Sequence, residues 1–384
     1  MSIRFTAEVV FWISAAALMY TYAGYPALIA LISTLWPRKV MRGNFTPSLT
    51  IIITAYNEER ALADKLTNTL ALDYPRDLME IIVASDCSTD RTDQIVRSFA
   101  SQGVLLYRQS QRLGKTAAQN AAVEKARGEI IIFSDATSIY ELDALRTITR
   151  NFADETVGCV GGRLIYVDPG DTRIGRGAKR YWGYETFLKK HESRACSLIG
   201  VSGCLYAVRK SAYVPLYHEA CSDFIIATKM IEQGLRTVYE PDATCREETN
   251  QRHDNELRMR VRIIAQTFTD LWRHRAILNP LRSGLYGIQL LSHKLMRYFV
   301  PVFLIVLFAA SAVLADGSAA FRALLLVQSL GYLTGAMSWM LENFGLRSRV
   351  LALPHYFVLA NVASVLAMFQ FLRGEKYARW EPIR

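Results

Sequence analysis

The sequence predicts an α/β domain with a parallel, doubly wound sheet, placed between membrane helices at the two ends of the chain. Short apolar strands alternate with helical segments from residue 44 onward, which is typical of a parallel sheet with crossover helices. Long apolar stretches near both termini are typical of helices that cross a bilayer. With 384 residues, the chain is long enough for one sizeable domain and these helices.

The net charge and the cysteine spacing indicate which ligands the protein binds and in which cellular compartment its domain lies. The net charge of +10 suits anionic lipids and phosphate-bearing ligands, whereas the scattered Lys and Arg residues form no run that indicates nucleic-acid binding. The six cysteines include no Cys-x-x-Cys pair. We therefore expect small buried thiols in a reduced, cytosolic domain, and no zinc or disulfide framework.

The apolar stretch Val9–Leu35 is long enough to cross a bilayer once. The basic residues Arg38, Lys39 and Arg42 follow this stretch. By the positive-inside rule we expect the next segment to lie in the cytoplasm and the chain to lie in the inner membrane of the cell. The predicted division is an N-terminal transmembrane helix with a basic linker at residues 1–43, a cytoplasmic domain at 44–282, an interfacial helix at 283–299 and a C-terminal transmembrane region at 300–384.

Buried strands are predicted at Ser48–Thr54, Glu80–Ala84, Val104–Tyr107 and Ile130–Phe133, with helices between them. Beyond these strands the pattern is less regular. It predicts a strand at Val157–Ile165, an aromatic helix at Tyr181–Ser193, a turn and strand at 200–206, a helix from Ser222 to about Gly234, and a short strand at Val238 that stops at Pro241.

Polar clusters follow the predicted strands at Asn57-Glu58, Asp86, Lys115 and Asp135. The carboxyl ends of parallel strands share one edge of a sheet, and ligands bind there. Each cluster alone is also compatible with an exposed turn, and Asp135 alone with a helix cap. Together they predict one site on the rim of the sheet.

The C-terminal region predicts an amphipathic interfacial helix at Gly284–Arg297 and three spans at Val300–Ala315, Ala319–Leu341 and Leu351–Leu372. Three spans place the tail outside the cell, although its basic residues favour the cytoplasm. Either one C-terminal segment is re-entrant, or the number of spans differs by one.

Residues Ser48 to Ile263 resemble the membrane-bound family 2 glycosyltransferases, the group of the cellulose, chitin and hyaluronan synthases. The resemblance implies a GT-A-like (Rossmann-like) fold and a nucleotide-sugar donor, expected to be a UDP-sugar. It implies that the segment Ala55, Tyr56, Asn57 and Glu58 holds the base. In the same way, Asp86 contacts the nucleoside, with Cys87 where the family has Gly, and Lys115 faces the diphosphate.

The family's Asp-x-Asp motif corresponds to Asp135, Ala136 and Thr137. The resemblance implies that Asp135 binds Mg²⁺ or Mn²⁺ with the donor, but Thr137 is a weaker ligand than the usual second Asp. The family's general base is an Asp that begins a helix, and Asp223 fits this description.

The family's Gln-x-x-Arg-Trp motif corresponds to Met259–Ile263, where Arg262 is kept and Arg260 is an additional basic residue. The resemblance implies that both arginines contact the donor. On a helix Arg258 and Arg262 share one face, whereas on an extended segment all three arginines would align. A basic helix facing solvent or lipid is the alternative.

The expected reaction is inverting sugar transfer to a growing polysaccharide at the inner membrane. Tyr181 and Trp182 are candidates for stacking on acceptor sugars, although aromatic residues of a core or of a membrane interface fit equally well. Ser202 and Gly203 are further acceptor candidates. The expected partners are the donor, a glycan or lipid-linked glycan, the bilayer, and a second copy or an export partner. Two alternatives stay open: single-sugar transfer to a lipid-linked acceptor, and a catalytically silent nucleotide- or glycan-binding subunit.

Overall fold

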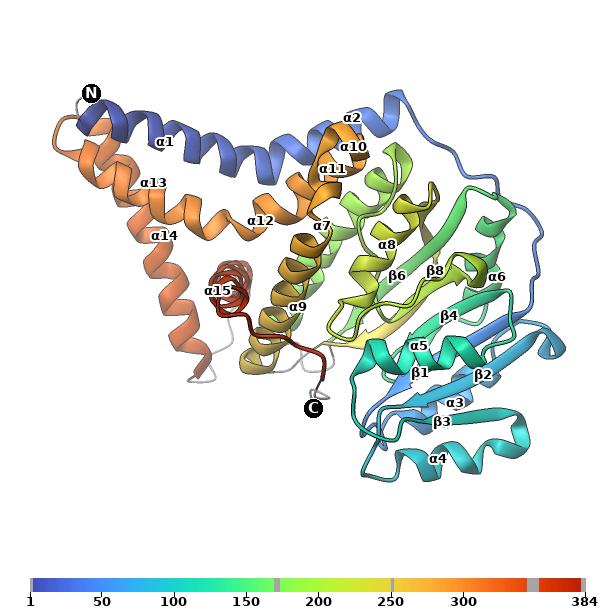
Figure 1. Ribbon diagram of the computed structural model, residues 1–384. Coiled ribbons are helices and arrows are strands. Elements are labelled where there is room, and N and C mark those ends of the chain that lie inside the picture. The colour runs from blue at the N-terminus through green and yellow to red at the C-terminus, as the bar shows by residue number, and fades with distance from the viewer. Residues whose placement is uncertain (1–2, 169–172, 250–251, 344–351, 381–384) are drawn as a thin grey trace.

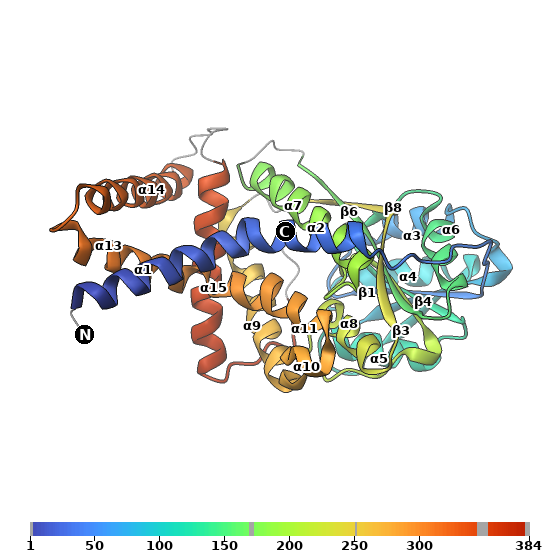
Figure 2. The same cartoon turned by 90° about the horizontal axis from the view of Figure 1, so that it is seen from above.

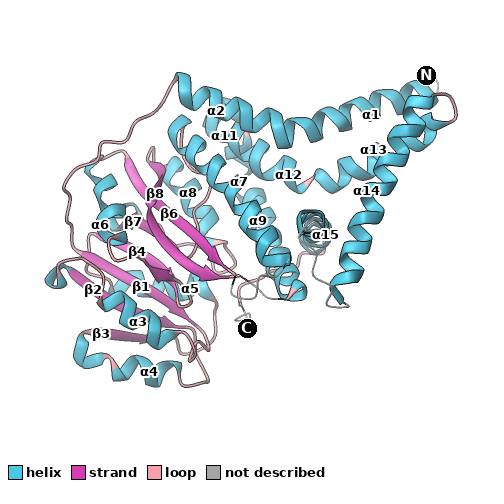
Figure 3. Ribbon diagram, turned by 180° about the vertical axis from the view of Figure 1, so that it is seen from behind, coloured by secondary structure: helices cyan, strands magenta, loops and turns pink. Residues whose placement is uncertain are grey.

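The computed structural model describes residues 3–168, 173–249, 252–343 and 352–380. Within this part of the chain, one eight-stranded sheet has the strand order β3-β2-β1-β4-β7-β6-β8-β5 (Figures 1 and 3). The strands are β1 (Leu49–Ala55), β2 (Met79–Ser85), β3 (Val104–Arg108), β4 (Ile130–Asp135), β5 (Ile139–Tyr140), β6 (Val157–Val167), β7 (Leu205–Arg209) and β8 (Arg236–Glu248).

The first half of the sheet is parallel, as predicted, because β1 pairs in parallel with both β2 and β4, and β2 with β3. Side chains of β1 alternate between the faces, so Ile51 and Ile53 pack on one side and Ile52 on the other. Helices cover both faces, which explains the continuous apolar strands. One face holds α3 (Leu62–Leu70), α4 (Thr92–Ser98) and α6 (Ala144–Thr149), and the other holds α5 (Lys115–Lys125) and α8 (Ser222–Glu232).

The second half of the sheet is mixed, because β7 pairs antiparallel with both β4 and β6. The prediction of a strand that stops at Pro241 was wrong: β8 continues to Glu248. Pro241 falls at an irregularity, where the β6–β8 pairing skips from Tyr239 to Thr244. A residue without a backbone N–H is tolerated at such a bulge. The continuation of β8 brings Glu247 to the edge of the sheet that carries the candidate site.

Apolar helices lie at both ends of the chain, as predicted. Among the described residues, three helical stretches are long and apolar enough to cross a membrane: Ile3–Leu35, Ala319–Leu341 and Ala352–Leu372. They belong to α1 (Ile3–Met19) with α2 (Tyr25–Leu35), to α14 (Ala319–Asn343) and to α15 (Ala352–Leu372). The predicted span at Val300–Ala315 is α13, a shorter helix that joins Leu285–Tyr298 at a bend of 58°; this pair is a broken span or a re-entrant loop. Leu285–Tyr298 contains α11 (Leu285–Gln289) and α12 (Met296–Tyr298), and the short α10 (Pro280–Ser283) precedes it.

Two long helices connect the sheet with the apolar helices (Figures 1 and 2). The predicted aromatic helix is part of α7 (Arg173–Ala195), which packs against α2 and α15, while α9 (His253–Arg273) packs against α15. The arginine segment is therefore helical, and Arg258 and Arg262 share a face that Arg260 does not.

A C-terminal tail, here Glu375–Trp380, follows α15 and runs back past the lower part of α9 towards the sheet (Figure 1). Gly374 makes this reversal possible because its φ of +75° favours glycine. The N–H of Gly374 bonds to the carbonyl of Phe371, and the N–H of Glu375 bonds to that of Gln370. These two bonds form a Schellman motif, which ends the helix and fixes the direction of the tail.

Candidate active site

Three charged side chains from different elements converge on Gly203. A Cβ atom added to Gly203 would lie 3.1 Å from Lys115 Nζ, 3.2 Å from Asp223 Oδ2 and 3.5 Å from Asp135 Oδ2. Lys115 begins α5, Asp135 ends β4 and Asp223 lies in the first turn of α8. The Lys115 ammonium forms an ion pair with Asp135. Burial lowers the pKa of Lys115, but Asp135 and Asp223 outweigh it and raise that pKa above its usual range.

Asp86 organises the loop that precedes Lys115. Its carboxylate is buried and accepts hydrogen bonds from the Gln109 amide at 3.0 Å, from Leu113 N at 2.8 Å and from Gly114 N at 3.0 Å. Burial raises the pKa of Asp86, although the backbone donors oppose this effect. Its own N–H donates to the carbonyl of Ala55, so the ends of β1 and β2 are held together.

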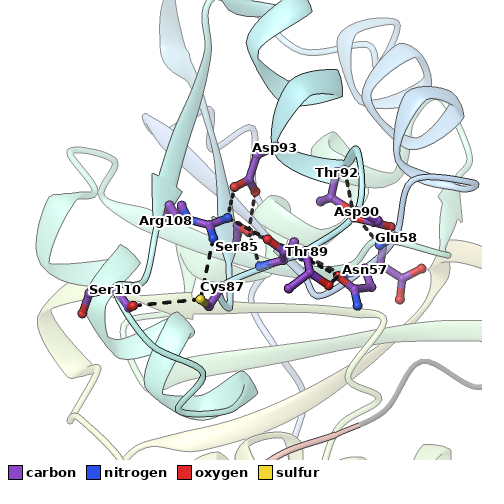
Figure 4. Close-up of polar contacts among 11 residues, drawn as sticks. Asn57, Glu58, Ser85, Cys87, Thr89, Asp90, Thr92, Asp93, Arg108 and Ser110 are labelled. Carbon is purple, nitrogen blue, oxygen red and sulfur yellow. Dashed lines mark hydrogen bonds and ion pairs between the residues drawn. The ribbon is translucent and has the colours of Figure 1, made fainter.

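The loops after β1 and β2 interlock through polar contacts (Figure 4). The Asn57 side chain accepts a hydrogen bond from Thr89 N at 2.8 Å, and Glu58 N donates to Thr92 Oγ1 at 2.8 Å. Asn57 and Cys87 are the non-glycine residues with positive φ in the described chain, at 53° and 60°. Such backbone conformations cost energy and often occur at functional sites. Cys87 stands where the resembled family has glycine, which takes this conformation without strain.

A second carboxylate lies beside Asp135, and the sequence did not reveal it. Thr137 Oγ1 donates a hydrogen bond to Glu247 Oε1 at 2.8 Å. Burial and the neighbouring Asp135 raise the pKa of Glu247 to about 7. In the resembled family the second Asp of the Asp-x-Asp motif supplies a carboxylate at this position. Here Thr137 takes the place of that Asp, and it forms a hydrogen bond with a carboxylate from β8, that of Glu247. No local signal indicated this arrangement, because the strand was expected to end at Pro241.

Asp223 is half-buried and lies beside the buried thiol of Cys221 and near the buried carboxyl group of Asp270. Cys221 Sγ donates to Asp223 Oδ1 at 3.0 Å, and the backbone carbonyl of Asp223 accepts from Val201 N at 2.8 Å. Asp270 of α9 accepts hydrogen bonds from the Tyr217 hydroxyl and from Cys221 N. Burial raises the pKa of Asp270 to about 8, and the charge of Asp223 adds to this effect.

A cavity of about 1090 Å³ extends from these residues towards the apolar helices. It brings together most of the predicted site residues, namely Glu58, Lys115, Asp135, Ala136, Tyr181, Trp182, Ser202, Gly203, Asp223, Arg260 and Arg262. Ala55, Tyr56 and Asp86 do not line it. Ala55 is buried, and Asp86 is turned into its loop.

The membrane-side end of the cavity carries several cationic side chains, of which Lys189 is buried and Arg260 and Lys294 are half-buried. Arg260 pairs with Glu256 and lies over the ring of Tyr181 at 4.8 Å. Lys189 donates to Ser202 Oγ at 2.7 Å, and Lys294 lies 5.7 Å from the centre of the Phe224 ring. In the described part of the chain, no carboxylate forms an ion pair with either lysine. Sequence reasoning missed both lysines because nothing in their local pattern distinguishes them from solvated residues.

Comparison with known proteins agrees with this architecture. Residues 50–214 match the family model described as Glycosyl transferase family 2. A poly-beta-1,6-N-acetyl-D-glucosamine synthase of Staphylococcus aureus is 27% identical over 203 residues, which are 51% of this chain and 49% of that protein. The probable glycosyltransferase YdaM of Bacillus subtilis is 30% identical over 136 residues, or 34% of this chain and 32% of that protein. The chain thus spans about half the length of the synthase.

A solved structure resembles nearly the whole chain. It is a mannosyltransferase from Pyrobaculum calidifontis in complex with GDP-Man and Mn²⁺, with a TM-score of 0.73 and 24% sequence identity. The similarity covers 94% of this chain and 99% of that chain. At this identity the likeness concerns the fold, and it shows that the GT-A-like domain and the apolar helices occur together in another protein.

Proposed function

We propose that the chain transfers a sugar from a nucleotide-sugar donor to an acceptor at the membrane, because residues 50–214 match the model of glycosyl transferase family 2. The observation that supports this most directly is the convergence of Lys115, Asp135 and Asp223 on Gly203. A cation for the leaving diphosphate and a carboxylate for the acceptor proton are what sugar transfer requires. Gly203 and the three charged side chains line the cavity in which the sugar would bind.

Asp223 acts as the general base in this proposal. It takes the proton from the acceptor hydroxyl while that oxygen attacks the anomeric carbon, and the bond to the donor diphosphate breaks. Lys115 stabilises the negative charge that develops on the diphosphate. A single in-line displacement inverts the configuration at the anomeric carbon. Glu58, Arg260 and Arg262 line the same cavity and would position the donor.

The residues around Asp135 fit a divalent cation that is bound together with the donor. Asp135 and Glu247 supply two carboxylates, and the Thr137 hydroxyl lies against Glu247. Among the described residues no group of three or more His, Cys, Asp or Glu side chains could hold a metal alone. Mg²⁺ and Mn²⁺ accept such a partial oxygen set, because phosphate oxygens and waters complete it. The cation would neutralise charge on the leaving diphosphate.

Extension of a polysaccharide is the first candidate for the overall activity, with a UDP-sugar as the donor. It is supported by the similarity to a poly-beta-1,6-N-acetyl-D-glucosamine synthase. Tyr181 and Trp182 line the cavity and would stack on acceptor sugars. Ser202 and Gly203 form the adjoining wall.

Transfer of one sugar to a lipid-linked acceptor is the second candidate. The observation that favours it is the pair Lys189 and Lys294 at the membrane-side end of the cavity. Lys189 is buried and Lys294 is half-buried, and within the described chain neither forms an ion pair with a carboxylate, which favours an anionic ligand beside them. A lipid-linked acceptor that carries phosphate would bring such an anion from the bilayer.

The tail supports one of the two membrane arrangements left open by the sequence. From its contacts with the α/β domain we infer that the C-terminal end of α15 lies on the same side of the membrane as that domain. The chain between them then crosses the membrane an even number of times. In this arrangement α14 and α15 cross, the bent pair Leu285–Ala315 is re-entrant, and the α/β domain faces the cytoplasm as Arg38 and Lys39 indicate.

The test is nucleoside diphosphate release by the purified chain in detergent, with panels of UDP- and GDP-sugars and with Mg²⁺ or Mn²⁺. Asp223→Asn should lower release at least 100-fold, within the range expected for loss of a general base. Asp77→Asn, at an exposed site on a turn before β2, is the matched control. Equal, measurable release by the wild type and Asp223→Asn would refute the role of Asp223 as the base, whereas no release by either would refute sugar transfer and favour a silent binding subunit. A ladder of products supports polymerisation, whereas a single product supports the second candidate.

A further inference from the structure

We propose that the C-terminal tail is an autoinhibitory strap that occupies the nucleoside end of the donor site. This inference rests on the proposed function, because it takes Tyr56 and the Asp86 loop as the place where the base and ribose of the donor bind. The strap would have to leave this position before a nucleotide-sugar binds fully.

The tail contacts the elements expected to hold the nucleoside. The ring of Trp380 meets the edge of Tyr56 at a centroid distance of 6.0 Å, while the Arg112 guanidinium lies over the face of Tyr56 at 3.8 Å. Arg112 also donates to the Trp380 carbonyl, and Arg379 Nε donates to the Arg112 carbonyl at 3.2 Å. One face and the edge of the candidate base-binding ring are therefore already in contact with the protein itself.

The middle of the tail closes on the loop that Asp86 organises. The Ala378 carbonyl oxygen is so near Gly114 that a Cβ added there would lie 1.8 Å from it. Gln266 of α9 anchors the strap from the other side, since its Nε2 donates to the Tyr377 carbonyl at 2.7 Å. The strap is thus held at three points between α9 and the rim of the sheet.

The residues that line the cavity show that the strap separates the diphosphate end of the donor site from its nucleoside end. Ala378, Arg379 and Trp380 line the cavity together with Lys115 and Asp135, the candidate diphosphate and metal residues. Tyr56, Asp86, Arg112 and Gly114 lie behind the strap and do not line the cavity. The sugar and diphosphate end of the donor site is therefore open, whereas the nucleoside end is filled by the chain's own aromatic and basic residues.

The experiment compares UDP and GDP binding, measured by calorimetry in detergent, for the full chain and for a chain that ends at Gly374. We expect the shortened chain to bind its preferred nucleotide about tenfold more tightly or better, since binding no longer has to displace an aromatic contact and a charge-assisted hydrogen bond. Trp380→Ala should give part of this gain and serves as the milder variant if shortening prevents folding. Lys376→Ala, an exposed tail residue, is the matched control and should match the full chain.

Affinities for both variants that equal or fall below that of the full chain would overturn the proposal, because the tail would then be a wall of the donor site. Failure of the proposed function gives a different pattern. In that case neither UDP nor GDP binds to any variant, and no variant releases nucleoside diphosphate from a donor.

Discussion

Replacing Cys87 by glycine should stabilise the protein, although it removes a side chain. Cys87 has a φ of 60°, in the left-handed region that costs a residue with a Cβ about 1–2 kcal/mol. Glycine avoids that cost but loses about 0.5–1 kcal/mol through the greater freedom of its unfolded chain. The thiol itself interacts only weakly with its surroundings, since Arg108 Nη2 lies 3.6 Å from it and Ser110 O lies 3.9 Å from it.

The net gain for Cys87→Gly is then about 0.5–1 kcal/mol, which corresponds to a rise in Tm of about 1–4 °C for a domain of this size. Thermal unfolding of the detergent-purified protein measures it. Gly103→Ala is the matched reverse control, because Gly103 has a φ of +82° and a new Cβ would meet nothing nearer than 3.4 Å. It should lower Tm by about 1–4 °C, because the same backbone strain and the same unfolded-chain entropy act in the opposite direction. An unchanged or lower Tm for Cys87→Gly, beside the expected fall for Gly103→Ala, would refute the reasoning.

Three further predictions concern the metal site, a buried carboxyl and the packing of the sheet. Glu247→Gln should raise the Mn²⁺ concentration needed for half-maximal nucleoside diphosphate release about tenfold or more, whereas Thr137→Val should have a smaller effect; equal effects of the two would contradict the role given to Glu247. Burial raises the pKa of Asp270 to about 8, so the folded protein keeps a proton that the unfolded chain loses near pH 4, and stability falls as the pH rises between these values. Asp270→Asn should remove this slope, so Tm measured from pH 5 to 8.5 should diverge increasingly from that of the wild type, and parallel curves would count against the assignment. Gly128→Ala should destabilise by about 1–3 kcal/mol or more, because its Cβ would lie 2.4 Å from the backbone of Leu49 and Thr50; a normal Tm would show that β1 can shift.

The parallel half of the sheet was predictable because its signals are local. The apolar runs of β1 and β4 end in polar residues, and the same pattern that locates each strand also places Lys115 and Asp135 on one rim. The start of α8 at Ser222 also followed from its sequence, so Asp223 could be placed in a first helical turn.

What escaped prediction depends on contacts between distant segments. The tolerance of Pro241 within β8 arises from a bulge opposite β6, and Glu247 reaches Thr137 only because the strand continues. The helical state of the arginine segment was left open because alternate arginines fit a helix and a strand alike. The position of the tail depends on the turn at Gly374 and on the hydrogen bond from Gln266. These two residues are 108 positions apart, so no local sequence pattern could predict that they act together.

The course of the tail also bears on how the protein is produced for study. The described chain begins at the tip of α1 that is farther from the sheet, whereas it ends beside Tyr56 and Arg112 (Figure 1). A purification tag that follows the strap would lie near Tyr56 and the Asp86 loop. There it would displace the strap or obstruct binding of the nucleotide-sugar. Activity measured on such a fusion would differ from that of the untagged chain, so a handle at the N-terminus is the better choice for any kinetic comparison.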